Sequence, residues 1–164
     1  MVVRVLYSIV FLLALVGCAS APLETEGVDG GLTPRDVKDH PEGAAGRTVL
    51  WGGVIADARN LPERTRLEIV AYPLSQRTQM PDTDAASSGR FRVYVDGYLE
   101  TAVYGRGRRF TVRADVQGTE TGRIDEAEYT FPVVQAEAFE LWPERTRRER
   151  GSGVNFGFGI ILSN

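Results

Sequence analysis

Arginine and tyrosine side chains recur at the polar positions of segments that alternate between apolar and polar residues. These side chains are Arg66, Tyr72, Arg90, Arg92, Tyr94 and, on a further segment, Arg113. A guanidinium offers a planar fork of donors to phosphate or carboxylate oxygens, and tyrosine rings contact sugars and lipids. Such residues on one face predict a site for anionic glycans or lipid head groups. The alternative is a solvated face on which Glu68 and Asp115 pair some of the arginines.

The chain offers few residues for catalysis or for binding a metal ion. Cys18 and His40 are the single cysteine and the single histidine, so neither a base-activated nucleophile nor a cysteine–histidine metal site is indicated. Asp82 and Asp84 lack the longer ligand series of a calcium loop. The carboxylates within 125–128 are typical of a solvated turn. We therefore expect no catalytic residues, no metal and no cofactor.

The cysteine follows an apolar run close to the first residue. Arg4 precedes this run, 5–16, which is shorter than the roughly 20 apolar residues of a membrane-spanning helix and is typical of a secretory leader. The end of the run resembles the lipobox of bacterial lipoproteins. The four residues that carry this resemblance are Leu15, Val16, Gly17 and Cys18.

The lipobox resemblance implies cleavage after Gly17 and acylation of Cys18. One acyl chain binds a membrane only marginally, whereas two or three hold firmly. The alternative, a free or disulfide-bonded thiol, has no second cysteine to support it. Ala19 and Ser20 follow without an aspartate, which by analogy with lipoprotein sorting favours the outer membrane. We expect 1–17 to be a signal peptide, and the rest to be anchored to the outer membrane and to face the periplasm.

Charge argues against nucleic acid as a partner. Removal of 1–17 takes away one charged side chain, Arg4, and leaves 147 residues with 18 basic and 22 acidic side chains, a formal net charge of −4. This balance gives no general attraction to a polyanion, and export separates the chain from nucleic acid. An envelope protein, glycan or lipid remains as the expected partner.

Residues 18–46 contain prolines, glycines and scattered charges with little apolar periodicity. This composition predicts an acylated cysteine followed by a flexible tether. Within it, Thr33 before Pro34 is a helix start signal, and Pro41 would end that helix early. We therefore expect a short helix over 34–39.

Period-two alternation predicts strands from residue 47 onward. The expected strands are 48–58, 65–74, 90–95, 108–118 and 126–134, with one or two helical turns in 96–107 and a turn at 119–123. This order predicts an all-β fold: a small, OB-like antiparallel barrel of five to seven strands with one or two short helices. A small sandwich would produce the same periodicity. The pair Gly52–Gly53 indicates a bulge or sharp coil in the first strand.

The last residues, 144–164, combine a charged connector with the apolar alternation "VNFGFGIIL" at 154–162. This alternation predicts a strand whose glycines allow another surface to approach closely. The strand would pack on its own barrel, or else contact lipid or a partner.

Six short sequences in order carry a family resemblance. They are "WGGVI", "LEIVAYPL", "GRFRV", "GRRFTVRADVQG", "EYTFPVV" and "LWP". This series is similar to that of the Slp family of outer-membrane lipoproteins, which is associated with starvation and stationary-phase stress. The resemblance implies that 47–143 form the Slp-type barrel domain, and it carries no catalytic residues. We expect a non-catalytic structural or interaction module of the envelope, with the arginine and tyrosine face as a possible ligand site.

Overall fold

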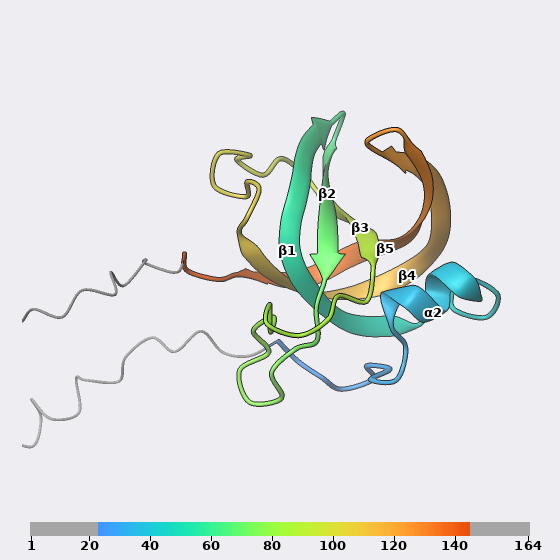
Figure 1. The fold of residues 1–164 in the computed structure, drawn as a ribbon. Helices are drawn as coiled ribbons and strands as arrows, with labels where there is room; N and C mark the ends of the chain where they lie inside the picture. Colours follow the sequence, from blue (N-terminus) through green and yellow to red (C-terminus); the bar gives the residue numbers. More distant parts are fainter. Residues whose placement is uncertain (1–22, 145–164) are drawn as a thin grey trace, which may run out of the picture.

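A computed structural model describes residues 23–144, and these form a closed barrel of five strands (Figure 1). Around the barrel the strands follow the order β1-β2-β3-β5-β4, and β4 pairs with β1 to close it. The strands are β1 (Thr48–Leu61), β2 (Arg64–Ala71), β3 (Arg90–Asp96), β4 (Arg109–Ile124) and β5 (Ala127–Leu141). The predicted OB-like, nearly all-β barrel is confirmed.

Neighbouring strands pair antiparallel, except that β3 and β5 form a short parallel pair. β1–β2 and β4–β5 are hairpins, and β4–β5 is the longer of the two, with its turn at Asp125–Glu126. In Figure 1 the far end of this hairpin curls over the barrel. The part of the hairpin beyond Gly118 therefore extends past the strand pairs that close the barrel.

The core consists of the inward residues that alternation predicts. On β4 every second residue from Phe110 to Val116 is at most 1% exposed. Phe91 of β3 and Val134 of β5 are fully buried, and the ring of Trp51 packs edge-on against Phe91 at a centroid distance of 5.2 Å. Aromatic and β-branched side chains thus fill the interior, as half-buried strands require.

Gly53 lets β1 curve sharply between its two neighbours. It pairs with Ala71 on β2 and Phe110 on β4. A Cβ at this position would collide with the backbone carbonyl of Val70, so only glycine permits this approach. The irregularity in the β1–β2 register lies between Ile55 and Asp57, so the glycine pair supplies the close approach and the bulge lies further along.

Two local predictions between β3 and β5 are wrong. The segment 96–107 forms turns, in which the N–H groups of Val103 and Tyr104 both donate to the carbonyl of Glu100 without a helix forming. The stretch 119–123, expected as a turn, continues β4 to Ile124. The reason is that every residue from Gly118 to Ile124 pairs with a residue of β5, so long-range pairing overrides the local turn signals.

The segment before the barrel packs on it. The predicted helix is present as α2 (Pro34–Asp39), capped by reciprocal hydrogen bonds between Thr33 and Asp36. Val37 is fully buried, and the indole N–H of Trp51 donates to the carbonyl of Leu32 at 2.7 Å. The prediction of a flexible tether is therefore wrong for 23–46, because helix α2 and its flanks contribute to the core.

Several predictions lie outside the described residues. They are the signal peptide 1–17, the lipobox with Cys18, the link up to residue 22 and the C-terminal strand at 154–162. No helix within residues 23–144 is long and apolar enough to cross a membrane.

Candidate functional site

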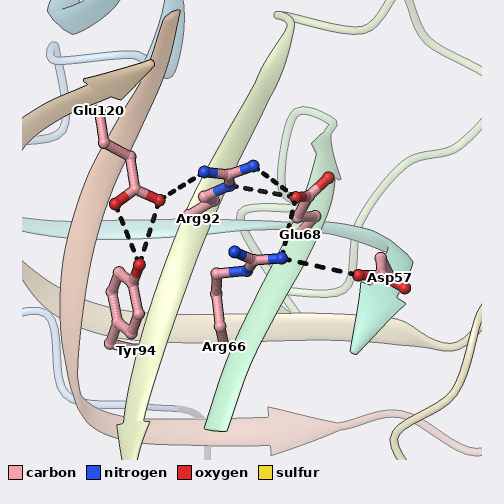
Figure 2. Close-up of polar contacts among 6 residues, drawn as sticks. All are labelled: Asp57, Arg66, Glu68, Arg92, Tyr94 and Glu120. Carbon is pink, nitrogen blue, oxygen red and sulfur yellow. Dashed lines mark hydrogen bonds and ion pairs between the residues drawn. The ribbon is translucent and has the colours of Figure 1, made fainter. Parts of the chain in front are cut away.

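The outward face of β2 and β3 brings together four of the six predicted side chains. In the antiparallel register Arg66 lies opposite Tyr94, and Glu68 lies opposite Arg92. Arg90 lies two residues before Arg92 on β3, so it is on the same face. Figure 2 shows the central members of this face, with Glu120 reaching them from β4.

Arg92 is the centre of a buried ion-pair network. Its Nε and Nη2 donate to Glu68 Oε1 at 3.1 and 2.7 Å, and its Nη1 donates to Glu120 Oε1 at 2.7 Å (Figure 2). The guanidinium also stacks over the Phe131 ring at 3.9 Å from the centroid. Burial alone would lower the pKa of Arg92, but its bonds to Glu120 and Glu68 outweigh burial and raise that pKa. Arg92 is therefore a fixed cation with two anionic partners.

Tyr94 belongs to the same network. Its hydroxyl lies 3.1 and 3.0 Å from the two carboxylate oxygens of Glu120, so it donates to this carboxylate. The guanidinium carbon of Arg64 lies over the Tyr94 ring, 4.1 Å from the ring centroid. Burial raises the pKa of Tyr94, and the bond to Glu120 adds to the rise. The phenol is thus a neutral donor.

Burial corrects the predicted ligand face at these two positions. Arg92 is 7% exposed and Tyr94 is 8% exposed, and both are hydrogen-bonded within the protein. An anionic ligand would have to displace Glu68 or Glu120 to reach either side chain. Arg92 and Tyr94 therefore hold strands together. The alternative prediction, in which Glu68 pairs an arginine of this face, applies to Arg92.

Glu120 is the network member that the sequence analysis missed. The turn expected at 119–123 placed it in a loop, whereas in β4 it points at Arg92 and Tyr94. Gly122, two residues on, lies directly over the Arg92 guanidinium: a Cβ there would be 2.5 Å from Nη2. The β-branched residues Thr119, Thr121 and Ile124 are the sequence signal that could have indicated a continuing strand.

Arg66 lies beside the network and is weakly paired. Its Nη2 is 3.6 Å from Glu68 Oε1 and 3.9 Å from Asp57 Oδ2 (Figure 2). Its Nε is buried and has no hydrogen-bond partner within the described chain. Arg66 thus retains donor capacity that its neighbours do not satisfy.

Tyr72 and Arg113 lie away from this face. Tyr72 follows the end of β2 and lines an apolar groove of about 570 Å³ that includes Leu32, Leu50 and Trp51. Arg113 of β4 pairs with Glu137 of β5 and donates to the carbonyl of Glu26. Arg113 lies in the part of β4 that pairs with β1, seven residues before Glu120, and its bonds to Glu137 and Glu26 hold it away from the others.

A second, basic groove opens beside the network, with a volume of about 420 Å³. Six arginines and three carboxylates line it, which gives a formal charge of +3. The arginines are Arg59, Arg66, Arg90, Arg92, Arg106 and Arg123, and the carboxylates are those of Asp57, Glu68 and Asp125. We call this the basic groove. It joins β1, β2 and β3 to the tip of the β4–β5 hairpin, on a chain whose overall charge is negative.

The histidine and the carboxylates considered as catalytic or metal-binding groups do not form a site together. His40 is exposed where α2 ends, and Asp82, Asp84 and the turn carboxylates at 125–128 are exposed as well. Within residues 23–144 no three histidine, cysteine or carboxylate side chains group as a metal site would require.

The strand order and the network together define an OB-like barrel with a long β4–β5 hairpin fastened over its β2–β3 face. Residues 15–158 match the family described as "Outer membrane lipoprotein Slp family", and the chain belongs to this family. The family resemblance noted in the sequence is thereby confirmed, and the protein is assigned to a family of outer-membrane lipoproteins.

Relatives in two bacteria share most of the chain. An uncharacterized protein of Haemophilus influenzae is 34% identical over 134 residues, which cover 78% of this chain and 70% of the relative. The uncharacterized lipoprotein YeaY of Escherichia coli is 30% identical and covers 80% and 68%. The outer membrane protein Slp of Escherichia coli is 28% identical and covers 82% and 71%.

Solved structures give weaker similarity. The mitochondrial single-stranded DNA-binding protein Rim1 of S. cerevisiae covers 57% of this chain and 92% of its own, at 12% identity and a TM-score of 0.35. A small single-stranded DNA-binding protein of Streptomyces coelicolor covers 58% and 94%, at 17% identity and the same TM-score. At these scores the likeness says nothing about a ligand.

Proposed function

We propose that this protein is a non-catalytic, lipid-anchored interaction module held against the periplasmic face of the outer membrane. Acyl chains on Cys18 form the anchor, and the OB-like barrel is the interacting part. Membership in a family of outer-membrane lipoproteins supports the anchor. The attachment of Leu23 to the barrel supports the position at the membrane surface.

Two hydrogen bonds hold the backbone of Leu23. Its N–H donates to Gln79 Oε1 at 2.7 Å, and its carbonyl accepts from Gln79 Nε2 at 2.8 Å. Gln79 is 8% exposed, and its own carbonyl accepts a bond from the buried Thr111 hydroxyl at 2.8 Å. The chain is thus fixed to the barrel from Leu23 onward.

The distance to the anchor follows from chain length. Five residue steps separate Leu23 from Cys18, and five residues span at most about 18 Å when fully extended. A barrel on so short a link stays next to the leaflet that holds the acyl chains. This position suits recognition of the membrane or of a partner embedded in it.

The chemistry of the described surface supports recognition rather than catalysis. His40, the single histidine, is exposed at the end of α2, and the buried titratable groups of the network are tied to one another. Arg92 and Tyr94 have hydrogen-bond partners that a general acid or base would need to release. A role under starvation stress rests on the family resemblance, and protein levels through stationary phase test it.

Recognition of an anionic ligand is the second candidate function. One observation favours it: several arginines of the basic groove have no partner within the described residues. The expected glycan or lipid head group would then meet these arginines, and Arg92 and Tyr94 would hold the strands that carry them.

Energy transfer tests the position at the membrane. Because Cys18 is the single cysteine, the thiol introduced by Gln76→Cys is the only free one once Cys18 is acylated. Gln76 is exposed in the loop that holds Gln79. A donor dye on the introduced thiol should transfer strongly to acceptor-labelled lipids when the lipidated protein is in vesicles. Transfer no higher than that of unanchored protein would refute the proposal.

A further inference from the structure

We propose that the basic groove binds a phosphate group of an envelope lipid or glycan through Arg59, Arg90 and Arg106. This inference rests on the second candidate function and changes the residues that carry it. The predicted face included Arg90 but neither Arg59 nor Arg106, which reach the groove from β1 and from the turns before β4.

Arg59, Arg90 and Arg106 are the lining arginines with unused guanidinium groups. Within residues 23–144 none of the three guanidiniums has a hydrogen bond or an ion pair; the bond between Arg90 and the Tyr129 hydroxyl uses the backbone N–H of Arg90. By contrast, Arg92 has two carboxylate partners, and Arg123 donates to the carbonyl of Glu126 at 2.7 Å.

Within residues 23–144 none of the three groove carboxylates forms an ion pair with these three cations. Glu68 is bound to Arg92 at 2.7 Å and lies near Arg66 at 3.6 Å. Asp57 is 3.9 Å from Arg66. The unpaired cations therefore face a concave surface from three separate elements, where their mutual repulsion favours a bound anion.

Phosphate is the anion that fits this arrangement. It has several strong acceptor oxygens, and arginine forks bind two of them at once, whereas a carboxylate has only two oxygens to share among three guanidiniums. Arg66 also lines the groove, and its contacts with Glu68 and Asp57 are long, 3.6 and 3.9 Å. An exposed phosphoryl group on a lipid or a sugar carries the required charge.

The Arg92 network prepares the groove for binding. It joins Glu68 of β2, Arg92 of β3 and Glu120 of β4, so the strands that present Arg90 and the hairpin tip are held at fixed positions. Preorganised side-chain positions reduce the entropy lost on binding. In this arrangement Arg92 is a positioning residue, and Arg59, Arg90 and Arg106 make the contacts.

The test titrates the full lipidated protein in neutral detergent micelles. Inorganic phosphate is the first probe, and calorimetry measures its affinity. The groove variant carries Arg59→Gln, Arg90→Gln and Arg106→Gln. A matched control removes the same charge outside the groove through Arg35→Gln, Lys38→Gln and Arg77→Gln, and thermal melting confirms that both variants are folded.

We expect the groove variant to lose at least tenfold in phosphate affinity and the control to change less than twofold. Equal loss in both variants, or no phosphate binding by the native protein, would overturn the proposal. Energy transfer from the dye at position 76 is also measured in the groove variant. The position at the membrane requires strong transfer whether or not the groove binds phosphate. Strong transfer without phosphate binding would therefore overturn the groove proposal alone.

Two further probes identify the source of the phosphate. Micelles that contain short-chain phosphatidic acid present it on a lipid, and glucosamine 1-phosphate presents it on a soluble sugar. Tighter binding of the first supports a lipid headgroup, and tighter binding of the second supports a phosphorylated glycan. Either result supports the proposal only if the groove variant loses this binding and the control variant keeps it.

Discussion

Gly122 of β4 lies over the guanidinium of Arg92, so closely that a Cβ on Gly122 would be 2.5 Å from Nη2 and 2.9 Å from Nη1. The same guanidinium is held by Glu68 and Glu120 and stacks on Phe131. Glycine at this position lets the long hairpin close over a buried charge. The bonds of Arg92 to Glu120 and Glu68 explain how the β4–β5 hairpin is fixed to β3 and β2.

Replacement of this glycine should destabilise the protein. Gly122→Ala adds a methyl group against a guanidinium that two carboxylates hold in place, and overpacking of this kind costs about 1–3 kcal/mol. In an unobstructed strand the same change would be neutral or favourable. Urea denaturation measures the free energy of unfolding, and Thr121→Ala on the exposed neighbour is the control. No loss of stability in Gly122→Ala would contradict the close contact.

The two arginines at the centre of the face should differ in their contribution to stability. Arg92→Met removes both hydrogen bonds to Glu68 and leaves this buried carboxylate with only the 3.6 Å contact to Arg66, which costs about 3 kcal/mol. Arg66→Met removes only contacts of 3.6 and 3.9 Å, and weak pairs of this kind contribute less than about 1 kcal/mol. Urea denaturation of both variants measures the difference. Equal losses would show that Arg92 does not hold the network together.

Tyr94 should make stability depend on alkaline pH. Burial and then the Glu120 carboxylate raise its pKa above the ordinary value of 10.0, so above pH 10 the folded state keeps a proton that the unfolded state loses. The free energy of unfolding therefore falls as pH rises from about 10 through the raised pKa. Urea titrations between pH 8 and 11 measure this slope.

Tyr94→Phe is the control for the alkaline slope. It cannot ionise, so the part of the slope that belongs to Tyr94 should disappear, while the other tyrosines titrate in both proteins. Identical slopes in the native protein and in Tyr94→Phe would contradict the raised pKa.

Gln79 should control how firmly the chain is attached at Leu23. Gln79→Ala removes both hydrogen bonds to Leu23, each of which contributes on the order of 1 kcal/mol. The amide of Leu23 should then exchange with solvent roughly tenfold or more faster, as measured by hydrogen exchange. Gln76→Ala in the same loop is the control. Unchanged exchange in Gln79→Ala would mean that these bonds do not hold the chain.

Strand periodicity and one capping signal predicted most of the fold. Alternation placed Phe91 and Phe110 in the core, where both are fully buried, because a half-buried strand has to present every second residue inward. Thr33 and Pro34 predicted α2 with its correct ends. These features depend on neighbours in the chain, which a single sequence reveals.

The candidate site depended on contacts that the sequence does not reveal. Glu120 meets Arg92 only because the β4–β5 hairpin curls over β3, and its segment resembles a turn. Tyr72 falls beyond the end of β2, so the alternation that placed it with Arg66 no longer applies. Arg113 alternates correctly but lies in the part of β4 that pairs with β1, where Glu137 holds it. Arg59, Arg90 and Arg106 come from three separate elements, so only the closed barrel shows that they line one groove.

The central claim is that a short link holds the barrel at the membrane, and lengthening that link tests it most directly. Insertion of about 20 Gly/Ser residues between Ser20 and Ala21 adds a root-mean-square reach of about 25 Å. In vesicles, energy transfer from the dye at position 76 to acceptor lipids should fall well below that of the protein without the insertion. Equal transfer with and without the insertion would contradict the claim, because the barrel would then be at the surface whatever the length of its link.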